Sequence, residues 1–104
     1  MNILINTGRN IDGHEALARQ AEYTVANTLG HLAEHVTRVE VHLSDENSGK
    51  GGSTDKRCLM EARLEGHQPI AVTHEAATVA QAISGGAEKL KQALGHLLDR
   101  RKQL

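Results

Sequence analysis

The sequence predicts an α+β domain with the element order β-α-β-β-β-α, in which a four-stranded sheet carries two helices packed on one face. Two long stretches repeat apolar residues at three- and four-residue intervals, which is typical of amphipathic helices. Between them lie segments in which apolar and polar residues alternate, which is typical of strands with one buried face. The 104 residues are enough for one domain, so residues 1–104 are expected to share one core.

The N-terminal part of the chain is expected to form a strand and then a helix. The Ile-rich segment 1–8 is the strand, and it ends at Gly8. Asp12 and Glu15 have the spacing of a capping box with Asp12 as the N-cap. The helix behind them is expected from about Gly13 to about His35, because it carries one apolar stripe: Leu17, Ala21, Val25, Leu29, Leu32 and Val36.

The middle of the chain predicts three strands that follow one another directly. Apolar residues alternate with polar ones over 38–43 and again over 57–64, and a shorter strand follows over 70–74. The Gly- and Ser-rich segment 45–54 is expected to be a loop. Cys58 falls on the inward face of its strand, so we expect a buried hydrophobe and not a reactive thiol.

The last helix is expected from Val79 to about Arg101. Thr78 and Gln81 form a second capping-box pattern at its start. Its apolar stripe consists of Val79, Ile83, Leu90, Leu94 and Leu97. Gly85 and Gly86 lie inside this helix, where each costs about 1 kcal/mol relative to Ala. We therefore expect a compensating close approach of this helix to the sheet or to a partner.

Composition and net charge restrict the cellular location and the partners that we expect for this protein. No apolar run approaches the roughly 20 residues that cross a bilayer, and the N-terminus lacks the pattern of a signal peptide. A single cysteine cannot form an internal disulfide, so a cytoplasmic protein is expected. The net charge of −1 is unusual for an RNA-binding domain. The placement of the 12 Lys and Arg residues therefore decides whether nucleic acid is a partner.

Basic residues gather in two places. Beside the apolar stripe of the last helix, one flank carries Lys89, His96 and Arg100, and the other carries Lys91 and Lys102. Arg101 adds a further positive charge at the end of this helix. The Gly-rich loop is surrounded by Lys50, Lys56 and Arg57. Either cluster can contact RNA phosphates, and glycines let the backbone approach a phosphate closely. The alternative is an ordinary solvated surface, with cations that favour a helix C-terminus.

One short pattern points to metal chemistry. His31, Glu34 and His35 read H-x-x-E-H, the pattern of one class of metalloprotease. Two His at i and i+4 of a helix can share a metal, but no third ligand is evident. We expect these residues to pack at a helix end, and we expect no catalytic residue, no metal and no cofactor. A metal-dependent hydrolase is the least favoured hypothesis.

The order and spacing of these elements resemble the ribosome hibernation-promoting factors, a family that includes the stationary-phase ribosome-associated inhibitor and the sigma-54 modulation proteins. The resemblance covers nearly the whole chain. It rests on Gly8-Arg9-Asn10-Ile11 before Glu15-Ala16-Leu17, on Gly51-Gly52-Ser53-Thr54-Asp55-Lys56-Arg57-Cys58, and on Ala82-Ile83 before Glu88-Lys89-Leu90. The sequence departs from the family at Thr78 and Ser84, where an acidic residue is usual, and the last helix is less basic.

The resemblance implies a function as well as a fold. It implies binding to the small ribosomal subunit across the channel that mRNA and tRNA occupy, which silences idle ribosomes in stress and stationary phase. It implies no cofactor. We therefore expect a non-enzymatic translation inhibitor that contacts rRNA phosphates, without a DNA or membrane partner. The alternative, favoured by the net charge of −1, is a regulatory protein-interaction domain of the same fold with weak or no ribosome binding. The sequence leaves the oligomeric state open.

Overall fold

The structure is a computed structural model that describes residues 1–8, 11–46 and 55–102, the last three of them by backbone only. The element order is β1 (Asn2–Thr7), α1 (His14–Leu29), the short 3-10 helix η1 (Gly30–His35), β2 (Arg38–Asp45), β3 (Lys56–Arg63), β4 (Ile70–Ala76) and α2 (Val79–Lys102). This order confirms the predicted α+β fold. Of the predicted loop 45–54, Asp45 ends β2 and residues 47–54 lie outside the described residues.

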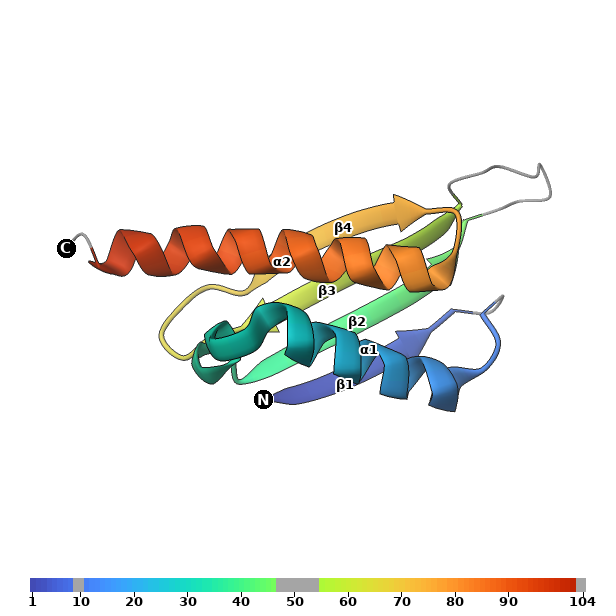
Figure 1. The fold of residues 1–104 in the computed structure, drawn as a ribbon, viewed down its shortest axis with the longest axis horizontal. Coiled ribbons are helices and arrows are strands. Elements are labelled where there is room, and N and C mark those ends of the chain that lie inside the picture. The colour runs from blue at the N-terminus through green and yellow to red at the C-terminus, as the bar shows by residue number, and fades with distance from the viewer. Residues whose placement is uncertain (9–10, 47–54, 103–104) are drawn as a thin grey trace.

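The four strands form one mixed sheet in the order β1-β2-β3-β4. β1 runs parallel to β2, whereas β2, β3 and β4 pair antiparallel. Both helices lie on the same face of this sheet, with α1 over the β1 side and α2 over the β4 side (Figure 1). The opposite face of the sheet is left without a covering layer in the described parts of the chain. No described helix is both long and apolar enough to span a membrane.

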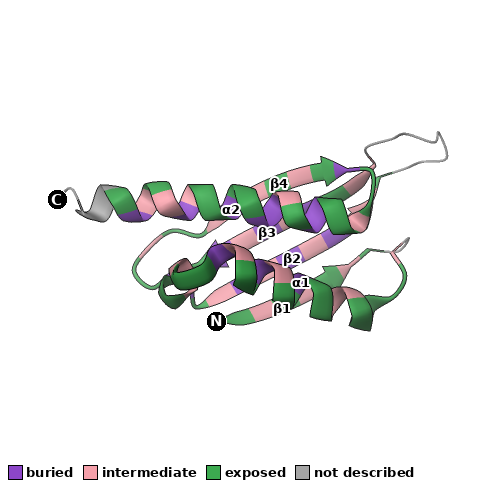
Figure 2. Cartoon of the chain, in the orientation of Figure 1, coloured by how far each residue is buried: buried purple, intermediate pink, exposed green. Residues whose placement is uncertain are grey.

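The core lies between the helices and the sheet, and alternation along the strands produces it (Figure 2). Val39, Val41 and Leu43 of β2 are fully or almost fully buried and point toward the helices. Cys58, Met60 and Ala62 of β3 stand opposite them. The helices contribute small and branched aliphatic side chains, among them Ala21, Val25, Leu29, Ile83, Leu90 and Leu94. Cys58 is fully buried, as predicted, and burial raises its pKa to about 12.

Helix α1 differs from its prediction at both ends. Its N-cap is Gly13, in the left-handed region at φ 78°, and no side chain caps it, so the capping box of Asp12 and Glu15 was wrong. The helix also ends at Leu29 and not near His35, because Gly30 adopts φ 56° and ψ −131°. An α-helix cannot continue through that backbone conformation. The chain resumes as the tighter helix η1.

Helix α2 confirms the predicted cap by the Thr78 side chain and the predicted close approach to the sheet. Thr78 caps its start, because the Thr78 hydroxyl accepts a hydrogen bond from the Gln81 N–H at 3.1 Å. The two glycines lie where the helix approaches the sheet. A Cβ on Gly85 would collide with the His74 ring, and a Cβ on Gly86 would lie 3.2 Å from Cys58 Sγ. The propensity cost of these glycines is therefore matched by close packing of α2 on β3 and β4.

Candidate nucleic-acid interface

The C-terminal end of α2 extends beyond the sheet (Figure 1). Its 24 residues correspond to about 36 Å of helix, whereas the seven residues of β4 span only about 24 Å. Leu98 is the last buried side chain among the described residues. Arg100, Arg101 and Lys102 follow it in the final turn. Consecutive helical positions are separated by about 100°, so these three positions cover about 200° of the helix circumference.

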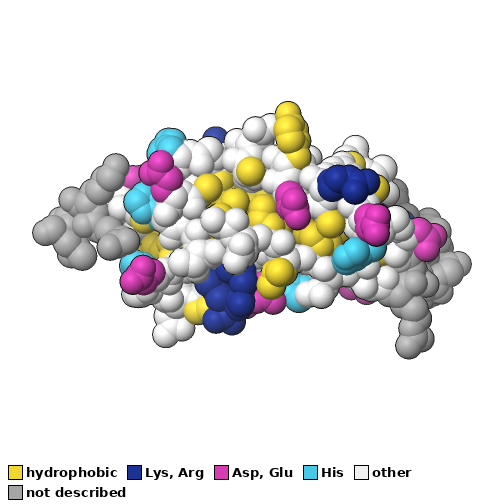
Figure 3. Space-filling model, turned by 90° about the horizontal axis from the view of Figure 1, so that it is seen from below, with side chains coloured by type: hydrophobic (Ala, Val, Ile, Leu, Met, Phe, Trp, Pro, Cys, Tyr) yellow, Lys and Arg dark blue, Asp and Glu magenta, His cyan; other side chains and the backbone are white. Residues whose placement is uncertain are grey.

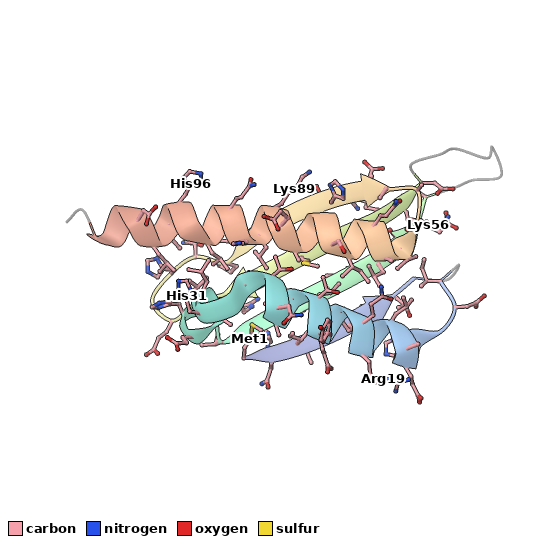
Figure 4. The ribbon with its side chains drawn as sticks, viewed as in Figure 1. Met1, Arg19, His31, Lys56, Lys89 and His96 are labelled. Atoms are coloured by element: carbon pink, nitrogen blue, oxygen red, sulfur yellow. The ribbon has the colours of Figure 1, made fainter. Side chains whose placement is uncertain are left out.

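Lys89 and Lys91 are exposed on the part of α2 that lies over the sheet. The Lys89 ammonium donates a hydrogen bond to the Thr73 carbonyl of β4 at 2.8 Å. Lys89 and His96 lie on the same side of α2, as their helical angles predict (Figure 4). Among the described contacts, neither Lys89 nor Lys91 pairs with a carboxylate. Within the described part of the chain, their positive charges are therefore not neutralised by an ion pair.

The predicted loop cluster has a different electrostatic environment. The Lys56 ammonium lies 2.9 Å from Asp55 Oδ1 and 3.3 Å from Asp45 Oδ2. The hydrogen bond to Asp55, helped by Asp45, holds the pKa of Lys56 above its ordinary value. Arg57 Nη1 lies 3.9 Å from Glu46 Oε1. Lys50 lies outside the described residues. The described cations of this cluster are thus already paired with carboxylates.

Two basic residues that the sequence reasoning did not single out lie on the open face of the sheet. Arg38 pairs with Glu40 at 3.0 Å, and Arg63 pairs with Glu61 at 3.5 Å and approaches Glu40 at 3.9 Å. The antiparallel register of β2 and β3 places Arg38 opposite Arg63 and Glu40 opposite Glu61, so each charge meets its complement diagonally or along its strand. This face is therefore mixed in charge and not a basic surface.

The structure does not bring the two predicted clusters together. Lys56 lies at the end of the sheet where β3 begins, whereas the basic end of α2 lies at the opposite end of the molecule (Figures 1 and 4). The longest axis of the molecule measures 50 Å. Arg19 of α1, which was also not singled out, lies on the side of the molecule away from Lys89 (Figure 4). A single phosphate cannot contact both clusters.

The H-x-x-E-H pattern falls in η1, where His31, Glu34 and His35 are all exposed. A 3-10 helix has about three residues per turn, so positions i and i+4 are separated by about 120° and do not share a face. The geometry that would let both His bind one metal is therefore missing. In residues 1–8, 11–46 and 55–102, no three His, Cys, Asp or Glu side chains are grouped so as to hold a metal ion.

Comparisons with known proteins agree with this architecture. The structure resembles a ribosomal subunit interface protein from Coxiella burnetii, with a TM-score of 0.76 and 16% sequence identity over 95% of this chain and 99% of that one. It also resembles the N-terminal domain of Protein Y from Thermus thermophilus, with a TM-score of 0.70 and 23% identity over 93% of this chain and 99% of that one. These identities are low enough that the likeness shows the fold alone.

Sequence comparison goes further than the structural likeness. No curated protein matches the sequence closely enough to count as a relative. Residues 4–102, however, match the family described as sigma 54 modulation protein / S30EA ribosomal protein. The match begins within β1 and reaches the end of α2. The chain therefore belongs to the sigma 54 modulation protein / S30EA ribosomal protein family.

Proposed function

We propose that this protein is a cytoplasmic translation inhibitor that binds the small ribosomal subunit through rRNA phosphates, near the channel for mRNA and tRNA, and silences idle ribosomes. The observation that carries this proposal is the family match over residues 4–102. The Coxiella burnetii structure of the same fold is called a ribosomal subunit interface protein. The proposal requires binding only and assigns no catalytic residue.

Helix α2 is the surface best suited to contact rRNA. Lys89 and Lys91 are exposed without a carboxylate partner among the described contacts, and the helix continues into Arg100, Arg101 and Lys102 beyond the sheet. An overhanging helix end can approach a phosphate backbone without the sheet in its way. Lysine and arginine in such a place contact phosphates and do not read bases. Lys50, Lys56 and Arg57 remain a second proposed contact, weakened by the carboxylates beside Lys56 and Arg57.

The first experiment measures co-sedimentation with ribosomes as a function of salt. Contacts of Lys and Arg with phosphates release condensed counterions, so binding should be strong at low salt and decline steeply as salt rises. Purified small and large subunits are tested separately, and the protein should pellet with the small subunit. A protein that stays at the top of the gradient with small subunits at low salt would contradict the proposal.

A charge-matched pair of variants then locates the contact. The variant Lys89→Ala/Arg100→Ala/Arg101→Ala removes three positive charges from α2. The control Arg19→Ala/Arg38→Ala/Arg63→Ala removes three from α1 and from the open face of the sheet, outside both proposed contacts. Each lost phosphate contact should reduce the salt slope by about one unit, so only the α2 variant should weaken binding strongly. Equal weakening by both variants would show that net charge matters and that α2 is not the contact.

Two further measurements complete this design. Exposed charges away from special features contribute within about 0.5 kcal/mol, so the α2 variant should keep the melting temperature of the parent protein. His31→Ala and His35→Ala should leave ribosome binding unchanged, since η1 lies outside the proposed contact. If either His variant lost binding without loss of stability, η1 would have to be included in the interface.

A second function is favoured by the ion pairs of the sheet. Arg38, Lys56, Arg57 and Arg63 are each neutralised by a carboxylate, and the net charge of the chain is −1. A regulatory protein-interaction domain with weak or no ribosome binding fits this charge balance. The sedimentation experiment separates the two functions, because only the ribosome-binding protein shows a salt-dependent association with the small subunit.

A further inference from the structure

The outer edge of β1 exposes backbone groups that lack a partner strand. In a parallel pair, only alternate residues of a strand bond to its neighbour. Asn2 donates its N–H to the Thr37 carbonyl at 3.1 Å, and Gly8 donates its N–H to the Leu43 carbonyl at 2.8 Å. The even-numbered residues therefore bond to β2. The N–H and C=O groups of Ile3, Ile5 and Thr7 point away from the sheet, where no described strand lies beside them.

This edge lacks the features that usually keep edge strands apart. Natural sheets protect their edges with charged residues, Pro or bulges. The sequence of β1, Asn2–Thr7, contains neither a charged residue nor Pro, and its register with β2 is continuous without a bulge. The opposite edge differs, because the Thr73 carbonyl of β4 accepts a hydrogen bond from Lys89. The two edges of one sheet are thus unequally protected.

Apolar side chains are exposed along the same side of the molecule. Among the described residues, the exposed large hydrophobic side chains are Met1 (44% exposed), Leu4 (47%) and Tyr23 (71%), and they all belong to the β1 and α1 region. A hollow of about 400 Å³ lies between β1 and α1, lined by Met1, Asn2, Ile3, Leu4, Glu22 and Ala26. Seen from this side, hydrophobic side chains form a band with charged groups around it (Figure 3). An apolar centre with a polar rim is the composition of a protein interface.

The sequence of the β1 edge is palindromic. Asn2-Ile3-Leu4-Ile5-Asn6 reads the same in both directions. An antiparallel pair of two such strands, centred on Leu4, places Ile3 opposite Ile5 and Asn2 opposite Asn6. The outward amides of Ile3 and Ile5 then exchange hydrogen bonds, and Leu4 faces Leu4 at a non-hydrogen-bonded position. The direction of the free amides and the symmetry of the side chains therefore agree on one register.

We propose that the β1 edge is an interface between two copies of this chain, which joins their two sheets into one continuous sheet. The two-fold axis passes between the paired Leu4 residues and keeps both helix layers on the same side. The pairing covers Leu4, extends the apolar surface of Ile3 and Ile5 across the boundary, and aligns Asn2 with Asn6 so that their amides can bond. A partner identical in sequence satisfies every one of these matches, as a closed symmetric interface requires.

This proposal is independent of the proposed ribosome binding. α2 packs over the β4 side of the sheet, so the β1 edge leaves Lys89, Lys91 and the overhanging end of α2 uncovered (Figure 1). The interface is also small, because β1 has only six residues and stable interfaces bury about 1,600 Å² in total. We therefore expect a weak dimer, with a dissociation constant in the micromolar range, whose population rises with protein concentration.

Cysteine pairs test the register directly. In the proposed dimer the two Leu4 Cα atoms lie about 4.5 Å apart. That separation is within the range of about 4.4–6.8 Å that a disulfide spans, so Leu4→Cys should give a covalent dimer under mild oxidation. Asn2→Cys is the matched control, because the two copies of residue 2 lie four residues apart along the strands, or about 13 Å. A mixture of Asn2→Cys and Asn6→Cys chains should again cross-link.

The native thiol does not interfere with this test. Cys58 is fully buried and its pKa is raised to about 12, so it supplies almost no thiolate at neutral pH. If Leu4→Cys gave no more covalent dimer than the unmodified protein does, the proposal would be overturned. The proposal would also be overturned if Asn2→Cys, without Asn6→Cys, gave as much covalent dimer as Leu4→Cys. Random collisions and not a fixed register would then explain the product.

Sedimentation equilibrium measures the association without cross-linking. The unmodified chain should form a concentration-dependent dimer, and Leu4→Lys should raise the dissociation constant by at least about tenfold because it places two like charges face to face. Leu59→Lys is the control, on the same open face but on the central strand β3. A dimer that survives Leu4→Lys, or an unmodified chain that stays monomeric at several hundred micromolar, would refute the β1 interface.

Discussion

The glycines in the two halves of α2 lie in opposite packing environments. In the first half, which packs on β3 and β4, Gly85 and Gly86 leave room for His74 and Cys58. In the second half, Gly95 has no atom within 4 Å of the position that a Cβ would take. The first two glycines are required by packing, whereas Gly95 only weakens the helix. A glycine within a helical sequence therefore indicates close packing only when the facing element is known.

The largest effect is expected from Gly85→Ala. The new methyl group would collide with the His74 ring, and overpacking of this kind typically costs about 1–3 kcal/mol of unfolding free energy. Urea denaturation followed by circular dichroism measures the loss. In a His74→Ala background the collision is absent, so Gly85→Ala should then be neutral or stabilising. A penalty that persists without the His74 ring would show that Gly85 is needed for another reason.

A pH titration of stability tests the packing of Cys58 beneath Gly86. The folded protein holds this thiol neutral up to about pH 12, whereas the unfolded chain ionises it from a pKa of 9.0. The unfolded state therefore loses the proton first as pH rises, and the folded state loses stability from this group between these two values. The expected loss is about 2 kcal/mol at about pH 10.5.

Cys58→Ala isolates this contribution. The variant should be less stable than the parent at neutral pH because it loses buried volume. The difference in unfolding free energy between the two proteins should become smaller above pH 9, because only the parent carries the thiol. Other groups that ionise at alkaline pH are common to both proteins and cancel in the difference. If the unfolding free energies of the two proteins changed in parallel from neutral to alkaline pH, the thiol would ionise as easily in the folded protein as in the unfolded chain.

The smallest effect, and of opposite sign, is expected from Gly95→Ala. Alanine raises helix propensity, and no neighbouring atom opposes the added methyl group. The gain in unfolding free energy should be about 0.5–1 kcal/mol. The same urea titration measures it. A loss of stability at position 95 would show that the second half of α2 packs more closely than the structure places it.

Sequence periodicity was sufficient for most of the fold, and it failed where backbone conformation departs from it. The apolar stripe of the first helix continues through Leu32 and Val36, because these side chains still face the core after the helix has ended. Periodicity therefore could not reveal the break at Gly30, which depends on its φ of 56°. The capping box at Asp12 failed in the same way, because Gly13 supplies the turn that starts α1.

The candidate site was predictable only as far as helical angles determine it. Lys89 and His96 share a flank of α2 as expected, because the spacing of residues along a helix determines their direction. The ion pair of Lys56 with Asp45 depends on the pairing of β2 with β3, which brings these two residues opposite each other. The approach of Arg63 to Glu40 likewise joins side chains of two adjacent strands. Such pairs follow from strand register, which local patterns do not specify.

The parallel pairing of β1 with β2 has a consequence for the order in which the chain folds. β2, β3 and β4 are antiparallel neighbours in sequence, so their contacts close short loops. β1 instead meets β2 only after all of α1 and η1, with Asn2 opposite Arg38. Closing that longer loop costs more chain entropy before any hydrogen bond rewards it. We therefore expect the β2–β3–β4 meander with α2 to form first, and β1 with α1 to dock last and detach first.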